Sequence, residues 1–197
     1  MNGNDERIEK VTKLDAASRQ LRTAVRLFFQ EGDSVSIHAL ASSAQELLRD
    51  LLKPAGGDGS FYKDANFLWP ERKKEFFSIV NGPQNFFKHA DRDGPDAVLD
   101  FRPAVSEYVL LDCIKMHREL TGRGLVPEGT AFGAWFMLRY PDMIMPGPAR
   151  DLMIAAFERL RRRVLRPEDK EVFLTMLDLP TESWQQIEEG EADGQTR

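Results

Sequence analysis

The residues best suited to carry out chemistry lie between positions 85 and 93. This stretch combines Asn85, Lys88 and His89, one of three histidines in the chain. An imidazole is the usual proton carrier near neutral pH, while an ammonium group can stabilise charge at a phosphate and a carboxamide can orient a hydroxyl. If the stretch is helical, Asn85 and His89 lie four residues apart on one face. The three side chains are our candidate catalytic set, for metal-independent RNA cleavage in which a 2′-hydroxyl attacks the adjacent phosphate.

Two other interpretations of this stretch stay open. Phe86 and Phe87 could anchor a turn whose polar side faces water. Asp91, Asp93 and Asp96 could offer oxygens to a divalent ion, but their spacing does not match an EF-hand loop, and aspartates beside a Gly-Pro pair are ordinary turn residues. The sequence therefore predicts no metal site. The glycines of residues 56–59 lack the Gly-Lys-Ser/Thr ending of a phosphate-binding loop, and we expect no cofactor.

The other two histidines have simpler expected roles. His117 falls within the apolar arc of a predicted helix, which favours a core histidine with one hydrogen-bond partner; a binding or catalytic role is the alternative. His38 lies just off an apolar stripe and is expected at the boundary with solvent.

Cationic side chains form a second candidate binding surface. Four arginines gather on one side of a predicted helix: Arg159, Arg162, Arg163 and Arg166. With Arg92, they are candidates for contact with nucleic acid or an acidic partner. Cations near a helix C-terminus also complement the helix dipole, and no aromatic residues interleave with the arginines to stack on bases.

Apolar residues that recur at three- and four-residue steps predict helices along most of the chain. We expect helices at residues 5–31, 34–53, 70–81, 84–90, 103–121, 128–139, 148–165 and 168–177, and only residues 98–101 as an extended segment. Gly32 should end the first helix in the left-handed conformation, and Asn81-Gly82-Pro83 should break the third. This pattern predicts an all-α fold, an antiparallel bundle of about four main helices with two or three additional C-terminal helices.

The domain organisation follows from the same pattern. We expect a helical bundle over residues 1–122, a C-terminal helical extension packed on the same core over 123–180, and an acidic, largely flexible tail over 181–197.

Composition narrows the classes of function. The net charge of −5 argues against a protein that coats nucleic acid non-specifically. A single cysteine, Cys113, excludes an internal disulfide and zinc sites built from several cysteines. The N-terminus is polar and no apolar run approaches ~20 residues, so we expect a cytoplasmic protein with no membrane partner.

Two antiparallel helices, a long loop and an Asn-x-x-x-His segment (Asn85 to His89) ahead of another long helix resemble the HEPN superfamily over about residues 14–121. The resemblance implies a small four-helix bundle that is often dimeric and frequent in bacterial toxin–antitoxin and defence systems. Many members are metal-independent ribonucleases, and others bind nucleotides or act as inactive partners. The arginine that active members carry before the histidine falls on Gln84, which has no positive charge; Lys88 or Arg92 would have to supply it.

We therefore expect a HEPN-like, non-catalytic module that binds a nucleotide, RNA or a partner protein, and that forms a homodimer. The alternative is a metal-independent endoribonuclease of toxin or defence type that uses His89 for proton transfer, with Asn85 and Lys88 assisting at the phosphate.

Overall fold

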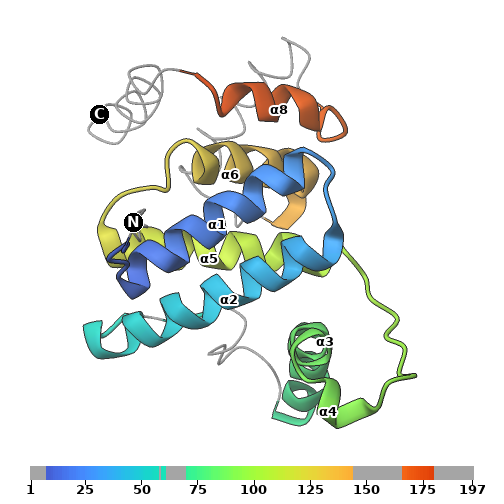
Figure 1. The fold of residues 1–197 in the computed structure, drawn as a ribbon. Helices are drawn as coiled ribbons and strands as arrows, with labels where there is room; N and C mark the ends of the chain where they lie inside the picture. Colours follow the sequence, from blue (N-terminus) through green and yellow to red (C-terminus); the bar gives the residue numbers. More distant parts are fainter. Residues whose placement is uncertain (1–7, 58, 61–69, 144–165, 180–197) are drawn as a thin grey trace, which may run out of the picture.

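The computed structural model describes residues 8–57, 59–60, 70–143 and 166–179. Every regular element assigned within these ranges is a helix, which confirms the all-α prediction, and residues 98–101 form no strand (Figure 1). The elements are α1 (Lys13–Phe29), α2 (Ser34–Leu52), the 3₁₀ turn η1 (Lys53–Ala55), α3 (Pro70–Lys88), α4 (Ala90–Asp93), α5 (Val105–Thr121), α6 (Glu128–Arg139), the 3₁₀ turn η2 (Pro141–Met143) and α8 (Lys170–Met176). The helix expected over 148–165 and the tail over 181–197 lie outside the described residues.

The first helix begins later than predicted because Thr12 caps it. The Thr12 hydroxyl accepts a hydrogen bond from the Asp15 backbone N–H at 3.1 Å, and the Asp15 carboxylate accepts one from the Thr12 N–H at 3.1 Å. This reciprocal capping box satisfies two backbone donors at the helix start. Residues 8–12 are not helical, so the prediction of a helix from residue 5 was wrong there.

The end of α1 also differs from the prediction. Glu31, not Gly32, takes the left-handed conformation, with φ of 53°. The Glu31 N–H donates to the Phe28 carbonyl at 3.3 Å and the Gly32 N–H donates to the Leu27 carbonyl at 2.9 Å. This pair of bonds is the Schellman motif, displaced one residue toward the N-terminus from the position expected for glycine. Asp33 then caps α2, accepting from the Ser36 N–H at 2.7 Å, and α2 begins at residue 34 as predicted.

The directions of α1, α2 and α5 follow from the contacts between them. Helices α1 and α2 form the expected antiparallel hairpin (Figure 1). Between α2 and α5, His38 Nδ1 lies 3.1 Å from Ser106 Oγ, and Gln45 donates to Asp112 at 2.6 Å. Because both partners advance together, these two helices are parallel.

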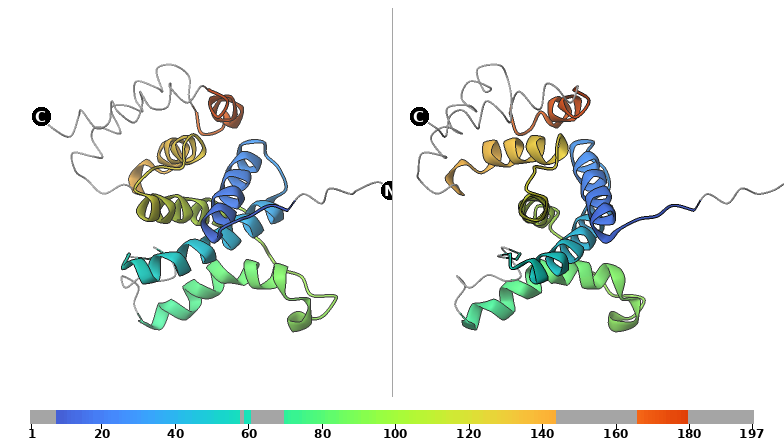
Figure 2. Two further views of the ribbon diagram at one scale, coloured as in Figure 1. Left: turned by 60° about the vertical axis from the view of Figure 1, so that its left-hand side comes forward. Right: turned by 90° about the vertical axis from the view of Figure 1, so that its left-hand side faces the viewer.

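Helices α6 and α8 complete one continuous core with α1, α2 and α5. The Tyr140 hydroxyl, just after α6, donates to Glu107 near the start of α5 at 2.6 Å, so α6 runs back along α5. Large side chains with less than 2% exposure come from all of these elements, including Leu21, Leu48, Leu110, Phe132 and Phe173. Figure 2 shows α8 on one side of this group of helices and the pair α3–α4 on the other.

Helix α3 continues through Pro83, so the predicted break at residues 81–83 was wrong. Val80, Pro83 and Gln84 are buried and Phe87 is half-buried, at steps of three, one and three residues. That spacing places them on one face of a helix, which packs on α2. Proline removes one intrahelical hydrogen bond, and burial of this face offsets the loss.

None of the helices in the described ranges combines the length and the apolar character needed to cross a membrane.

Candidate functional site

The candidate catalytic residues lie where α3 gives way to α4. Asn85 and Lys88 belong to the last turn of α3 and are exposed. His89 is half-buried and has left the helix, with φ of −128° and ψ of 79°, although its backbone N–H still donates to the Asn85 carbonyl at 3.1 Å. Asn85 and His89 therefore share the end of α3, but only Asn85 is helical.

Two cations lie close to this histidine in the sequence, Lys88 and Arg92. Lys88 Nζ lies 3.9 Å from the Glu46 carboxylate on α2, so a carboxylate balances its charge. Arg92 is exposed on α4. Gln84, on the buried face of α3, is only 5% exposed.

An aromatic contact anchors the stretch to the rest of the protein. The Phe87 ring meets the His38 imidazole edge-on at 5.9 Å and the Phe101 ring at 5.3 Å between centroids. His38 is fully buried, with its Nδ1 3.1 Å from Ser106 Oγ. The prediction that His38 borders solvent was wrong, because two rings distant in sequence cover it.

The structure places the aspartates of the following segment at the surface. Asp91, Asp93 and Asp96 are all exposed. In the part of the chain that the structure describes, no group of three or more histidine, cysteine, aspartate or glutamate side chains is arranged to hold a metal ion.

His117 is the core histidine that the apolar pattern predicts. It is 7% exposed, and its Nε2 lies 3.0 Å from the Ser18 hydroxyl. That hydroxyl donates to the Leu14 carbonyl at 2.8 Å, so the imidazole Nε2–H is the donor to Ser18. Burial lowers the pKa of His117, and the positive charge of Arg22 lowers it further. A neutral imidazole that is buried and bonded to Ser18 fits the predicted core role.

Of the four clustered arginines, only Arg166 falls within the described residues, where it is exposed. Arg159, Arg162 and Arg163 lie outside them.

A buried carboxylate between α2 and α5 was not among the predicted sites. Asp112 is 2% exposed, and its Oδ2 accepts hydrogen bonds from Gln45 Nε2 and Ser60 Oγ, both at 2.6 Å. The signal in the sequence was an aspartate directly before Cys113, inside the apolar arc of α5. Buried carboxylates are rare unless hydrogen-bonded or paired, so an aspartate in an apolar arc indicates a hydrogen-bond partner on a neighbouring element.

A second buried carboxylate joins α6 to α1. Glu128, at the first turn of α6, is 2% exposed. It accepts from Arg26 Nε at 2.9 Å and also from Arg22, whose guanidinium donates to the Val126 carbonyl as well. An acidic residue at this end also complements the helix dipole. Both carboxylates are structural in geometry, since neither faces a described cavity.

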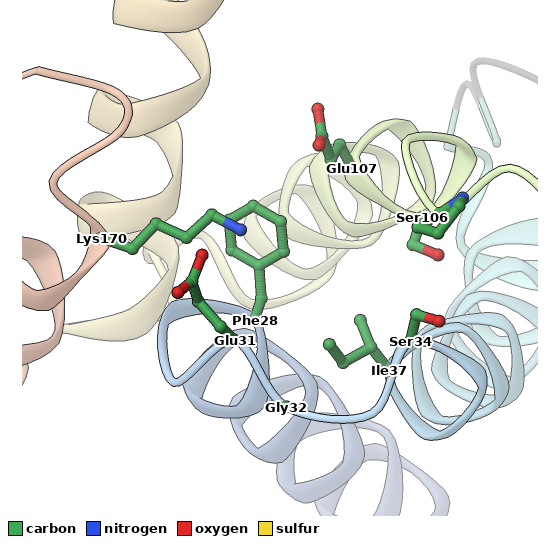
Figure 3. Close-up of a pocket in the computed structure, with 9 residues that line it drawn as sticks. Phe28, Glu31, Gly32, Ser34, Ile37, Ser106, Glu107 and Lys170 are labelled. Atoms are coloured by element: carbon green, nitrogen blue, oxygen red, sulfur yellow. The ribbon is translucent and has the colours of Figure 1, made fainter.

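The described residues line a cavity of about 200 Å³ where the α1–α2 turn meets the start of α5. Figure 3 shows Lys170 of α8 reaching into it beside Phe28 and Glu31, with the hydroxyls of Ser34 and Ser106 across the space. Lys170 Nζ lies 3.9 Å from the centre of the Phe28 ring, a cation–π distance. This cavity contains none of the residues predicted from sequence as catalytic.

Comparisons of the chain with protein-family models, with curated proteins and with solved structures find no match.

Proposed function

We propose that this chain is a non-catalytic, protein-binding module of HEPN-like type. Its binding edge is the surface of residues 85–102, which comprises the end of α3, helix α4 and the segment that leads into α5. The charge of this edge carries the proposal. Its exposed charged side chains are Lys88, Arg92 and Arg102 together with Asp91, Asp93, Asp96 and Asp100. Carboxylates outnumber cations, whereas affinity for RNA comes from cations that neutralise phosphates.

The surroundings of His89 support binding over catalysis. A ribonuclease needs an accessible imidazole and a cation that reach one phosphate together. By the HEPN resemblance, the arginine position holds a buried glutamine, Gln84, and the adjacent Lys88 lies 3.9 Å from the Glu46 carboxylate. The competing function, a metal-independent endoribonuclease with His89, Asn85 and Lys88, would have to use a lysine that already faces a carboxylate.

The edge also has a feature suited to a protein partner. Val98 is 90% exposed and lies in the non-helical segment between Asp96 and Asp100. An apolar side chain with carboxylates on both sides fits a small apolar pocket rimmed by basic residues. Protein interfaces have this plan, an apolar centre with a polar rim. Whether the partner is a second copy of the chain, as the resemblance implies, stays a prediction.

RNA cleavage tests the non-catalytic part of this proposal. Wild-type protein and His89→Ala are incubated with a mixed-sequence RNA in EDTA. We expect no cleavage by the wild type above the level of the variant. Cleavage that persists in chelator and disappears in His89→Ala would establish the endoribonuclease instead.

Site-specific photo-crosslinking tests the binding part. A photoreactive amino acid replaces Val98, and in a matched control it replaces Lys115, an exposed residue of α5 away from the edge. We expect a discrete protein adduct in cells from position 98 and none from position 115. Adducts to nucleic acid, or equal labelling from both positions, would contradict a protein-binding edge at residues 85–102.

A further inference from the structure

Helix α8 occupies its place as a short peptide ligand would. It has seven residues, too few for a helix to be stable alone in water, so its conformation depends on the surface beneath it. That surface is the C-terminal half of α1 and helix α6. The indole N–H of Trp135 on α6 donates to the Pro167 carbonyl at 2.8 Å, which fixes the chain just before α8 begins.

Three side chains anchor α8, at spacings of three and four residues. Phe173 is fully buried and its ring stacks on Phe29 at 5.4 Å with 9° between the planes. Leu177 is 3% exposed. Lys170 places its ammonium group 3.9 Å from the centre of the Phe28 ring. A cation, an aromatic and an aliphatic residue on one face of a helix are the pattern by which amphipathic helices bind grooves.

The cation position of this groove is incompletely filled. A cavity of about 200 Å³ extends beside Lys170 and is bordered by Glu31 and Glu107. Among the described residues, no carboxylate lies within 4.0 Å of the Lys170 ammonium. Figure 3 shows the Glu31 carboxylate beside the lysine side chain and the Glu107 carboxylate on the far side of the Phe28 ring. A guanidinium is longer, forked and suited to carboxylates and aromatic faces, so an arginine would use space that lysine leaves empty.

We propose that the groove formed by α1, α6 and the start of α5 is a binding site for an amphipathic helix of a partner protein. The helix presents an arginine, an aromatic residue three positions later and an aliphatic residue four positions after that. Helix α8 is the intramolecular occupant of the same groove and competes with the partner. Helix α8 lies on the opposite side of the body from α3 and α4 (Figures 1 and 2), and the proposed partner helix binds a different surface from the 85–102 edge, so the inference goes beyond the function proposed above.

Competition between α8 and the partner helix determines the affinity that a binding experiment should measure. A tethered segment competes at a high effective concentration, and the affinity of an outside helix falls by the fraction of molecules in which the groove is open. Loosening α8 should therefore strengthen binding of a helix added in trans, although it removes contacts within the protein.

The probe is a fluorescein-labelled peptide of residues 166–179 in which Lys170 is replaced by arginine. Its binding to the full chain is followed by fluorescence anisotropy. We expect at least tenfold tighter binding to Phe173→Ala than to wild type. A peptide in which Phe173 is replaced by alanine should not bind either protein. In the Phe173→Ala protein, adding Glu31→Gln should weaken the arginine peptide about tenfold, with less effect on the peptide that keeps lysine.

A second variant keeps the proposal testable if Phe173→Ala does not fold. Lys170→Glu keeps the Phe173 anchor and loosens α8 by placing a negative charge beside Glu31 and Glu107. It should also bind the peptide more tightly than wild type does. Equal affinity for wild type and for a folded loosened variant, or no binding to either variant, would overturn the proposal. Because the 85–102 edge is unchanged in these proteins, neither result alters the outcome of the RNA and crosslinking tests.

Discussion

The body of the protein (α1, α2, α5 and α6) and its outer pair (α3 and α4) use polar side chains in opposite ways. In the body, polar groups are buried and bonded to partners far away in sequence. Gln45 donates to Asp112 on another helix, and Ser18 contacts His117. At the end of the outer pair, Asn85, Lys88 and Arg92 face outward.

The difference indicates where the chain can change without unfolding. A buried polar group that loses its partner costs more than an exposed one, because water cannot replace the lost bond. Substitutions in the outer pair should therefore affect recognition, and substitutions in the body should affect stability. Three experiments can separate the two regions, beginning with the one of largest expected effect.

Truncation of a buried aliphatic side chain should distinguish the regions most clearly. Leu48 on α2 is fully buried, whereas Ile79 on α3 is 56% exposed. We expect Leu48→Ala to lower the free energy of unfolding by about 3 kcal/mol, since it leaves a cavity in the core. The matched change Ile79→Ala should cost less than about 0.5 kcal/mol. Urea denaturation followed by circular dichroism measures both. Similar losses would show that the outer pair shares the packing of the body.

The sequence was most informative about the body, where local signals and packing agree. The Glu128–Arg139 helix has the predicted bounds, and α2 begins at residue 34 as expected. His117 takes the core position that its apolar neighbours indicate. In these cases helical periodicity determines which face of the helix is buried. A pattern within the helix itself is therefore enough to predict the position.

The errors arise where a distant contact overrides a local rule. Pro83 does not end α3, because burial of residues 80, 83 and 84 against α2 outweighs one lost hydrogen bond. His38 is buried because Phe87 and Phe101 cover it. The bonds of Gln45 and Ser60 to Asp112 join residues 67 and 52 positions apart, a pairing that no spacing within one helix can indicate.

The second experiment detaches the outer pair from the body. Phe87 joins the two regions through ring contacts with His38 and Phe101. We expect Phe87→Ala to cost about 1 kcal/mol, in line with the loss of aromatic pairs. Hydrogen exchange should accelerate at residues 79–93 and stay unchanged in α1 and α6. Val98→Ala, at a residue that is 90% exposed, is the control and should change neither region. Faster exchange throughout α1 after Phe87→Ala would refute a separable outer pair.

The smallest effect should come from protonation of the body's histidine. Burial, with a further contribution from Arg22, lowers the pKa of His117 in the folded protein below the usual histidine value of 6.5. Below pH 6.5 the unfolded chain therefore binds a proton more readily than the folded one does, and stability decreases as the pH falls. Above pH 6.5 the imidazole is neutral in both states, so its contribution is fully present.

Urea midpoints at pH 8.5, 7.5 and 5.5 test this sign. For His117, we expect no contribution to the change between pH 8.5 and 7.5, and a loss of stability between 7.5 and 5.5. In His117→Gln, whose amide can still donate to Ser18, the second change should be smaller than in the wild type. An equal or larger change in the variant would mean that other groups account for the acid sensitivity. His117 would then not be the neutral, buried counterpart of the outward-facing polar residues on the outer pair.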